Sequence, residues 1–95
     1  MKRQQKKEPS GKGTTRRKDK EGLTRLGERL RAVRKQKNIS QEELAFTSGI
    51  SLSQIGRIER ATINPTVSTI FTICRTLDIE VSELFTFKLE NNNIN

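Results

Sequence analysis

Residues 41–60 constrain the fold of this chain more than any other segment, because they predict two short helices joined by a tight turn. The segment reads QEELAFTSGISLSQIGRIER. Gly49 lies near its middle, and glycine, which has no Cβ, readily adopts the left-handed conformation that ends a helix. Ser51 can cap a second helix by accepting a hydrogen bond from the backbone N–H of Ser53 or Gln54. We therefore expect one helix to end near Gly49 and another to begin directly after Ser51.

The apolar residues of this segment are spaced so that the two helices can pack against each other. Ala45 is small, which lets the second helix cross the first closely, at roughly 90 to 120°. Four aliphatic side chains are expected to point inward and hold this angle: Leu44, Ile50, Ile55 and Ile58. The outer face and start of the second helix are then left to Leu52, Ser53, Gln54, Gly56 and Arg57. This is the layout of a helix-turn-helix unit, whose exposed second helix suits a DNA groove.

Several motifs, in order along the chain, resemble the phage repressor and Cro type of helix-turn-helix domain, which is widespread in bacteria and their mobile elements. The resemblance covers residues 23–85. It rests on SQEELA at 40–45, IER at 58–60, NPT at 64–66 and LDIEVSELF at 77–85. It implies an all-α, five-helix, lambda-repressor-like DNA-binding domain with its helix-turn-helix at 41–60.

Apolar spacing predicts a first helix ahead of the helix-turn-helix segment. Leu26, Leu30 and Val33 recur at helical intervals. Thr24 is the expected N-cap of this helix, and Asn38, which tolerates the left-handed conformation, is expected to end it.

Capping and turn signals predict where the other helices begin. Ser40 and Glu43 have the spacing of a capping box, in which each side chain accepts a hydrogen bond from the other residue's backbone N–H. Pro65 fits the first turn of a fourth helix running to about Leu77, and a short fifth helix is expected over 81–85. The inward residues expected of these last two helices are Val67, Ile70, Ile73, Cys74, Leu77, Leu84 and Phe85.

Charge is distributed unevenly along the 95 residues, whose net charge is +8. Residues 1–22 hold nine Lys and Arg against three acidic residues and have no aliphatic residue after Met1. We expect this part to be a disordered basic tail, which either attracts DNA phosphates or only aids solubility. Residues 23–85 are expected to form one small domain and residues 86–95 a C-terminal tail, with no separate ligand-sensing domain and no small-molecule ligand.

Residue types exclude several classes of function. The chain has no His, so catalytic triads built on His are excluded, and a single Cys cannot form an internal disulfide or a zinc-finger set. We expect no catalytic residue, no cofactor and no metal site. The longest apolar run has three residues, far short of the roughly 20 that span a bilayer. The expected location is the bacterial cytoplasm, in association with the nucleoid and without contact to a membrane.

The second helix of a helix-turn-helix unit meets base edges in the major groove, which defines the candidate base-reading residues. Arg57 can donate two hydrogen bonds to guanine, although an arginine on a solvated face could instead reach only a phosphate. Ser53 and Gln54 can each donate or accept a hydrogen bond. Leu52 offers an apolar surface for a thymine methyl group, unless it is partly buried.

Five residues are candidates for contacts to the DNA backbone, which position a protein without reading sequence. For Gln41, the resemblance implies a contact from the N-terminus of its helix to a phosphate, as helix dipoles favour. The other candidates lie at the start of the second helix and in the loop that follows it: Ser51, Thr62, Asn64 and Thr66.

The resemblance also implies a structural ion pair and shows two departures from the family pattern. Arg34 and Glu59 match a pair that forms a largely buried salt bridge in this family, which would make their role structural. Ala61 stands where glycine commonly follows the second helix, which puts a left-handed residue there in question. Gly56 lies inside that helix, where it either permits close approach to DNA or occupies an indifferent surface position.

These features predict a sequence-specific regulator of transcription that binds double-stranded DNA, most simply a homodimeric repressor or autoregulator on a palindromic operator. Phe85, Phe87 and Leu89 are candidates for the dimer interface. The alternative is an antitoxin or restriction-modification controller or adaptor that acts mainly through a protein partner, using Phe46, Phe71 or the C-terminal tail. The sequence gives no support to an enzyme.

Overall fold

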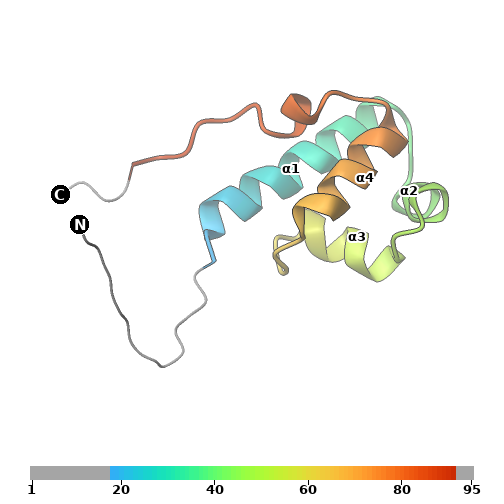
Figure 1. Cartoon of the computed structure of the whole chain (residues 1–95), viewed down its shortest axis with the longest axis horizontal. Helices are drawn as coiled ribbons and strands as arrows, with labels where there is room; N and C mark the ends of the chain where they lie inside the picture. The colour runs from blue at the N-terminus through green and yellow to red at the C-terminus, as the bar shows by residue number, and fades with distance from the viewer. Residues whose placement is uncertain (1–17, 92–95) are drawn as a thin grey trace.

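Residues 18–91 are described by the computed structural model, and this part of the chain is all-α, with no strand. Four α-helices and one 3₁₀ helix follow one another (Figure 1). Their bounds are α1 Lys20–Gln36, α2 Gln41–Ser48, α3 Leu52–Glu59, α4 Val67–Leu77 and η1 Val81–Leu84. The predicted all-α class is confirmed, while residues 1–17 of the tail that was expected over residues 1–22 lie outside the described residues.

One hydrophobic core holds these helices together. Helix α1 packs against α3 and η1, and α2 packs against α3 and α4. Because α3 is contacted by both α1 and α2, its inner side is buried and its opposite side faces outward (Figure 1). The buried apolar residues are Leu26, Leu30, Val33, Leu44, Ile55, Ile58, Ile70, Ile73, Cys74, Leu77 and Leu84.

Helix α1 begins earlier than the sequence predicted. Its N-cap is Asp19, whose carboxylate Oδ1 accepts a hydrogen bond from the backbone N–H of Gly22 at 2.9 Å. Thr24 is therefore inside the helix, and the expectation that it caps the helix is wrong. The helix extends into the range assigned to the tail because Asp19, a residue type preferred over threonine as an N-cap, lies five residues earlier.

The turn signals of the helix-turn-helix segment are confirmed. Ser40 Oγ accepts from the Glu43 N–H at 2.9 Å, and Glu43 Oε1 accepts from the Ser40 N–H at 3.4 Å, which completes the capping box. Gly49 ends α2 in the left-handed region, with φ of 77°. Ser51 Oγ accepts from the Gln54 N–H at 3.1 Å and so caps α3.

The last two elements differ from the expectation of a fourth and a fifth α-helix. Helix α4 begins at Val67 after an N-cap at Thr66, so Pro65 precedes the helix. The five-helix prediction is wrong for the last element: η1 is a single 3₁₀ turn, closed by i to i+3 hydrogen bonds such as Glu83 N–H to Glu80 O at 2.9 Å. A segment of only four residues is too short for successive α-helical hydrogen bonds, and 3₁₀ geometry is common in such short pieces.

Two residues expected in the core are exposed instead. Val67 sits at the first position of α4, before the helix turns toward the core, and Phe85 follows η1. Beyond Phe85 the chain runs back along α1 (Figure 1), where the Arg25 guanidinium lies 5.8 Å from the centre of the Phe87 ring. The backbone N–H of Glu90 also donates to the Glu21 carboxylate at 3.4 Å. The C-terminal segment through Glu90 therefore packs on the domain.

Three residues other than glycine adopt positive φ angles among the described residues. Asn38 ends α1 with φ of 58°, as predicted, and Asp78 ends α4 with φ of 56°. Ala61 follows α3 with φ of 61°. The left-handed conformation is thus retained at position 61 although alanine replaces the usual glycine, at a cost of about 1 kcal/mol.

The contact between α1 and α3 depends on Gly27. A Cβ built at Gly27 would lie 2.6 Å from the carbonyl oxygens of both Ile58 and Glu59. These are backbone atoms at the end of α3, which cannot move aside without shifting the helix. Glycine at this position therefore sets how closely α3 approaches α1.

We predict that Gly27→Ala destabilises the domain, by about 1 to 3 kcal/mol, because the added methyl group overpacks the α1–α3 contact. Gly22→Ala is the matched control in the same helix, since its Cβ would meet only the Asp19 side chain at 3.4 Å. That variant should gain about 0.5 to 1 kcal/mol from the better helix propensity of alanine. Urea unfolding followed by circular dichroism measures both, and equal effects of the two substitutions would contradict this role of Gly27.

Candidate nucleic-acid interface

The outward side of α3 carries most of the residues predicted to read bases. Leu52 is 44% exposed, and Ser53 and Arg57 are also exposed. Gln54 is half-buried, and its backbone N–H is taken by the Ser51 cap. Ser53 and Arg57 are four residues apart, so they lie on the same side of the helix. The expected outer face is therefore present, with Gln54 at its edge.

Gly56 was predicted to lie on the outer face of α3, but its position differs from this prediction. It is buried, and its nearest covering group is the side chain of Arg60, whose Nη1 lies 3.0 Å from the position a Cβ would take. Arg60 is exposed and is the C-cap of α3. Arg60 was not among the residues predicted to contact DNA, although a glycine followed four residues later by an arginine on the outer face of a helix is a readable signal.

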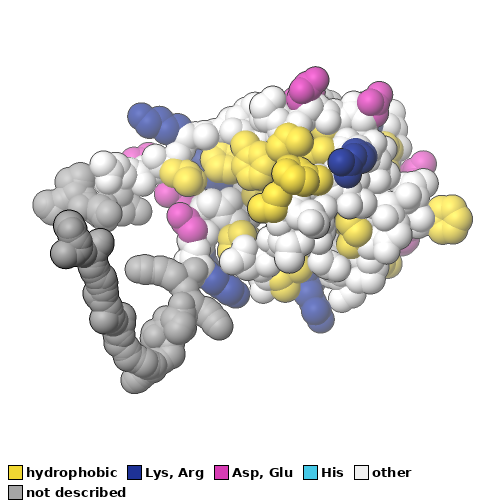
Figure 2. Space-filling view, viewed as in Figure 1, with side chains coloured by type: hydrophobic (Ala, Val, Ile, Leu, Met, Phe, Trp, Pro, Cys, Tyr) yellow, Lys and Arg dark blue, Asp and Glu magenta, His cyan; other side chains and the backbone are white. Residues whose placement is uncertain are grey.

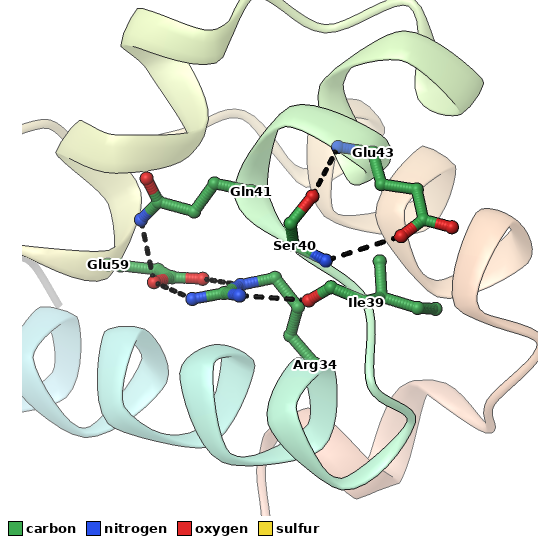
Figure 3. Close-up of polar contacts among 6 residues, drawn as sticks. All are labelled: Arg34, Ile39, Ser40, Gln41, Glu43 and Glu59. Atoms are coloured by element: carbon green, nitrogen blue, oxygen red, sulfur yellow. Dashed lines mark hydrogen bonds and ion pairs between the residues drawn. The ribbon is translucent and has the colours of Figure 1, made fainter.

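The side chain of Gln41 links the N-terminus of α2 to the end of α3. Its Nε2 donates to Glu59 Oε1 at 2.9 Å (Figure 3). The side chain of Gln41 is thus directed inward to Glu59. A phosphate contact at this helix end would accordingly use the backbone N–H groups of Gln41 and Glu42, because that of Glu43 already donates to Ser40 Oγ.

The loop that follows α3 holds the remaining polar candidates, all of them exposed. The Thr62 backbone N–H donates to the Arg57 carbonyl oxygen at 2.9 Å, and its hydroxyl does so at 3.3 Å. Thr66 Oγ1 accepts from the Thr69 N–H at 3.1 Å and caps α4. Asn64 lines a hollow with residues of α1, including Leu23. The structure therefore places Thr62 against α3, while Asn64 and Thr66 lie farther along the loop.

Arg34 and Glu59 form the buried salt bridge that the family resemblance implied. Arg34 Nε lies 2.7 Å from Glu59 Oε2, and Arg34 Nη2 lies 2.9 Å from Glu59 Oε1. The two side chains are only 9% and 3% exposed. Arg34 Nη1 also donates to the Ile39 carbonyl oxygen at 2.9 Å (Figure 3). This network joins α1, the chain entering α2 and the last residue of α3.

The pKa of the Glu59 carboxyl reflects two opposing effects. Burial raises the pKa, while hydrogen bonds from Arg34 and Gln41 and the charges of Arg34 and Arg31 lower it, and the net result is a pKa below the ordinary value of 4.5. The hydrogen bond to Glu59 raises the pKa of Arg34. Both groups therefore remain charged at neutral pH, despite their burial.

We predict that Glu59→Gln lowers the free energy of unfolding at pH 7 by about 3 to 5 kcal/mol, because it leaves a buried Arg34 without its counter-charge. Since the pKa of Glu59 is lowered on folding, its contribution is complete above the ordinary pKa of 4.5 and is lost as the pH falls below it. Below about pH 5, the stability of the variant should thus depend less on pH than that of the original chain.

Urea unfolding at each pH measures this effect, with Glu42→Gln as control. Glu42 is exposed on the first turn of α2, where removing a negative charge should cost less than about 1 kcal/mol. If Glu59→Gln unfolds with the same acid dependence as the original chain, the salt bridge is not a source of stability.

Other kinds of site find little support in the described residues. In that part of the chain no group of three or more His, Cys, Asp or Glu side chains could hold a metal ion. Its helices are also too short or too polar to cross a membrane. Cys74 is buried in the core, and burial raises the pKa of its thiol.

Helices α2 and α3 are short and are joined by the left-handed Gly49. Helix α3 packs against α1 and α2 and is exposed on its opposite side, which is the arrangement of a helix-turn-helix domain. Comparison with known proteins agrees. The model of a helix-turn-helix family matches residues 30–84, which is more than half of the chain. The chain therefore belongs to this helix-turn-helix family.

Its relatives include controllers and repressors. The control protein C.SmaI of Serratia marcescens is 39% identical over 61 residues, covering 64% of this chain and 73% of that protein. The immunity repressor of Bacillus phage phi105 is 36% identical over 59 residues, covering 62% of this chain and 41% of the repressor. Several of the curated relatives are matched over less than half of their own length.

A solved structure has the same fold. The restriction-modification controller protein C.AhdI of Aeromonas hydrophila superposes with a TM-score of 0.65 at 44% identity. The match covers 66% of this chain and 96% of that chain.

Proposed function

We propose that this protein is a sequence-specific regulator of transcription that binds double-stranded DNA through α3. The observation that carries the proposal is the exposed outer side of α3, whose inner side is held by α1 and α2 and whose end is held by the Arg34–Glu59 salt bridge. A helix held in this way can enter the major groove without reordering, so less free energy is lost on binding. Membership of the helix-turn-helix family supports the same function.

Each candidate residue has a distinct role in this proposal. Arg57 donates two hydrogen bonds to a guanine edge, and Ser53 and Gln54 bond to neighbouring base edges. Leu52 at the start of α3 contacts a thymine methyl group. The N-terminus of α2 at Gln41 and the residues Ser51, Thr62, Asn64 and Thr66 contact the phosphates that flank the groove.

We predict that Arg57→Ala relaxes the preference for one base pair in each half-site by about 1 to 3 kcal/mol, because the two hydrogen bonds to guanine are lost. Selection of bound duplexes from a random pool, carried out in parallel with the original chain and the variant, measures this directly. Lys88→Ala is the control, since it removes one positive charge from the C-terminal segment, far along the chain from α3.

The same experiment tests the proposed function itself. The original chain should return an enriched consensus sequence at near-physiological salt, and Lys88→Ala should return the same one. If no sequence is enriched by the original chain, specific DNA recognition is refuted. If the consensus of Arg57→Ala is unchanged and only the affinity falls, Arg57 contacts a phosphate and does not read a base.

We also propose that the protein acts as a homodimer on a palindrome, with half-sites about 34 Å apart. Five of the seven large hydrophobic side chains that are exposed in the described residues belong to α4, η1 and the C-terminal segment: Val67, Phe71, Val81, Phe85 and Leu89. Figure 2 shows a hydrophobic patch on this side of the molecule. A patch of this kind is typical of an interface, and a second copy of the chain would bury it.

We predict that Phe71→Lys weakens the dimer at least about tenfold, because it places a charge in an apolar contact. Phe71 lies on α4 and is already partly exposed, so the substitution should leave the fold intact. Phe46→Lys on α2 is the matched control, since Phe46 is 87% exposed and lies outside the patch. Analytical ultracentrifugation measures the change, and an equal effect of both variants would place the interface elsewhere.

Restriction-modification control is the setting that the comparisons favour for this regulator. Nearly the whole of C.AhdI and most of C.SmaI are matched, whereas less than half of the phage repressor is. An adjacent reading frame for an endonuclease or a DNA methyltransferase would support this setting. An adjacent toxin gene would support the alternative of an antitoxin that acts mainly through a protein partner.

A further inference from the structure

Arg60 lies on the same outer side of α3 as the proposed base-reading residues. Ser53, Arg57 and Arg60 follow one another at intervals of four and three residues, which places all three on one helical face. Arg60 and its two neighbours on that face are all exposed. Within residues 18–91, no carboxylate forms an ion pair with Arg60, and the neighbouring Glu59 is bound to Arg34. The guanidinium of Arg60 therefore keeps its donors for a ligand.

The side chain of Arg60 does not extend away from the end of the helix but folds back over Gly56. The Nη1, Cζ and Nη2 atoms lie 3.0, 3.7 and 3.9 Å from the position that a Cβ of residue 56 would occupy. Long side chains on helices generally lean toward the preceding turn, and here the turn beneath is bare backbone. The guanidinium is thereby carried one turn toward the N-terminus of α3, to the part of the helix that enters the groove.

The backbone does not require glycine at position 56. The only glycine with a positive φ among the described residues is Gly49, so an L-residue could adopt the conformation of Gly56. Alanine would also be a better helix former at an interior position. What glycine provides here is the space in which the Arg60 guanidinium lies.

We propose that Arg60, seated on Gly56, is a second base-reading arginine of this protein, which recognises a guanine in the major groove beside the base read by Arg57. The inference rests on the proposed function of α3 in DNA recognition. Arginine suits this role because its planar fork can donate two parallel hydrogen bonds to guanine O6 and N7. The lack of a side chain at position 56 is what allows the fork to lie against the helix instead of at its end.

The experiment compares the duplexes that are selected from a random pool by the original chain and by Arg60→Lys, Arg60→Ala and Gly56→Ala. Arg60→Lys keeps the charge but loses the bidentate geometry, so we expect it to lower the preference for one guanine about tenfold or more. Gly56→Ala should lower the preference at the same base pair, because its methyl group displaces the guanidinium. Its melting temperature should be no lower than that of the original chain, which excludes a loss through unfolding.

A double variant separates this proposal from direct approach of the Gly56 backbone to DNA. Adding Gly56→Ala to Arg60→Ala should change neither affinity nor consensus beyond the effect of Arg60→Ala alone. If Gly56→Ala weakens binding equally in both backgrounds, the glycine acts by itself and the proposal is overturned.

The proposal is also overturned if Arg60→Lys and Arg60→Ala leave the consensus unchanged. A uniform fall in affinity, with the slope of log affinity against log salt reduced by about 0.9, would identify Arg60 as a phosphate contact. Failure of the proposed function looks different, since the original chain would then enrich no sequence at all. We expect the Arg60 variants to lose the preference only for the guanine assigned to Arg60 and to keep the preference at the base pair assigned to Arg57.

Discussion

The buried salt bridge between Arg34 and Glu59 is the interaction on which the proposed recognition surface depends. It joins the end of α1 to the end of α3, and the same two side chains also bind the Ile39 carbonyl and the Gln41 amide ahead of and within α2. Two helix ends and the chain between them are thus held by one set of hydrogen bonds. Because both charges are almost completely buried, leaving either one without its partner would be strongly unfavourable, which disfavours other arrangements of these helix ends.

Close packing of α1 against α3 also holds α3 in position, in addition to the salt bridge. Gly27 allows the backbone of α3 to approach α1, at the same helix end that carries Glu59. The position and the direction of α3 are therefore set by buried contacts on its inner side, and its outer side is free to vary with the DNA sequence to be read. Two features that reduce stability, Gly56 within α3 and Ala61 in the left-handed region after it, lie at or next to the proposed DNA-reading surface. Such departures from local preference are expected where function, and not folding, selects the residue.

The sequence was sufficient to predict the elements that are specified by local chemistry. The capping box at Ser40, the left-handed glycine at Gly49 and the cap at Ser51 depend only on residues within one turn of the chain, and all three are confirmed. The family resemblance supplied the pairing of Arg34 with Glu59, which no local rule could have given. Those residues account for the geometry of the helix-turn-helix.

The features that were missed depend on contacts between distant parts of the chain. Both Asp19 and Thr24 can cap a helix, and the earlier residue is used in a fold where the C-terminal segment packs on the first turns of α1. The role of Gly27 depends on where the α3 backbone passes, which becomes visible only once the helices are packed. Arg60 is the exception, because the signal is local: the direction of its side chain is decided by the missing side chain of Gly56, only one turn earlier.

Amide chemical shifts of the ¹⁵N-labelled protein, followed during titration with a selected duplex, decide whether the outer side of α3 contacts the DNA. We expect the largest changes in chemical shift on the first turn of α2, on residues 51–60 and on the loop over 61–66. Changes confined to α4, η1 and the C-terminal segment, with α3 unaffected, would show that another surface binds the DNA.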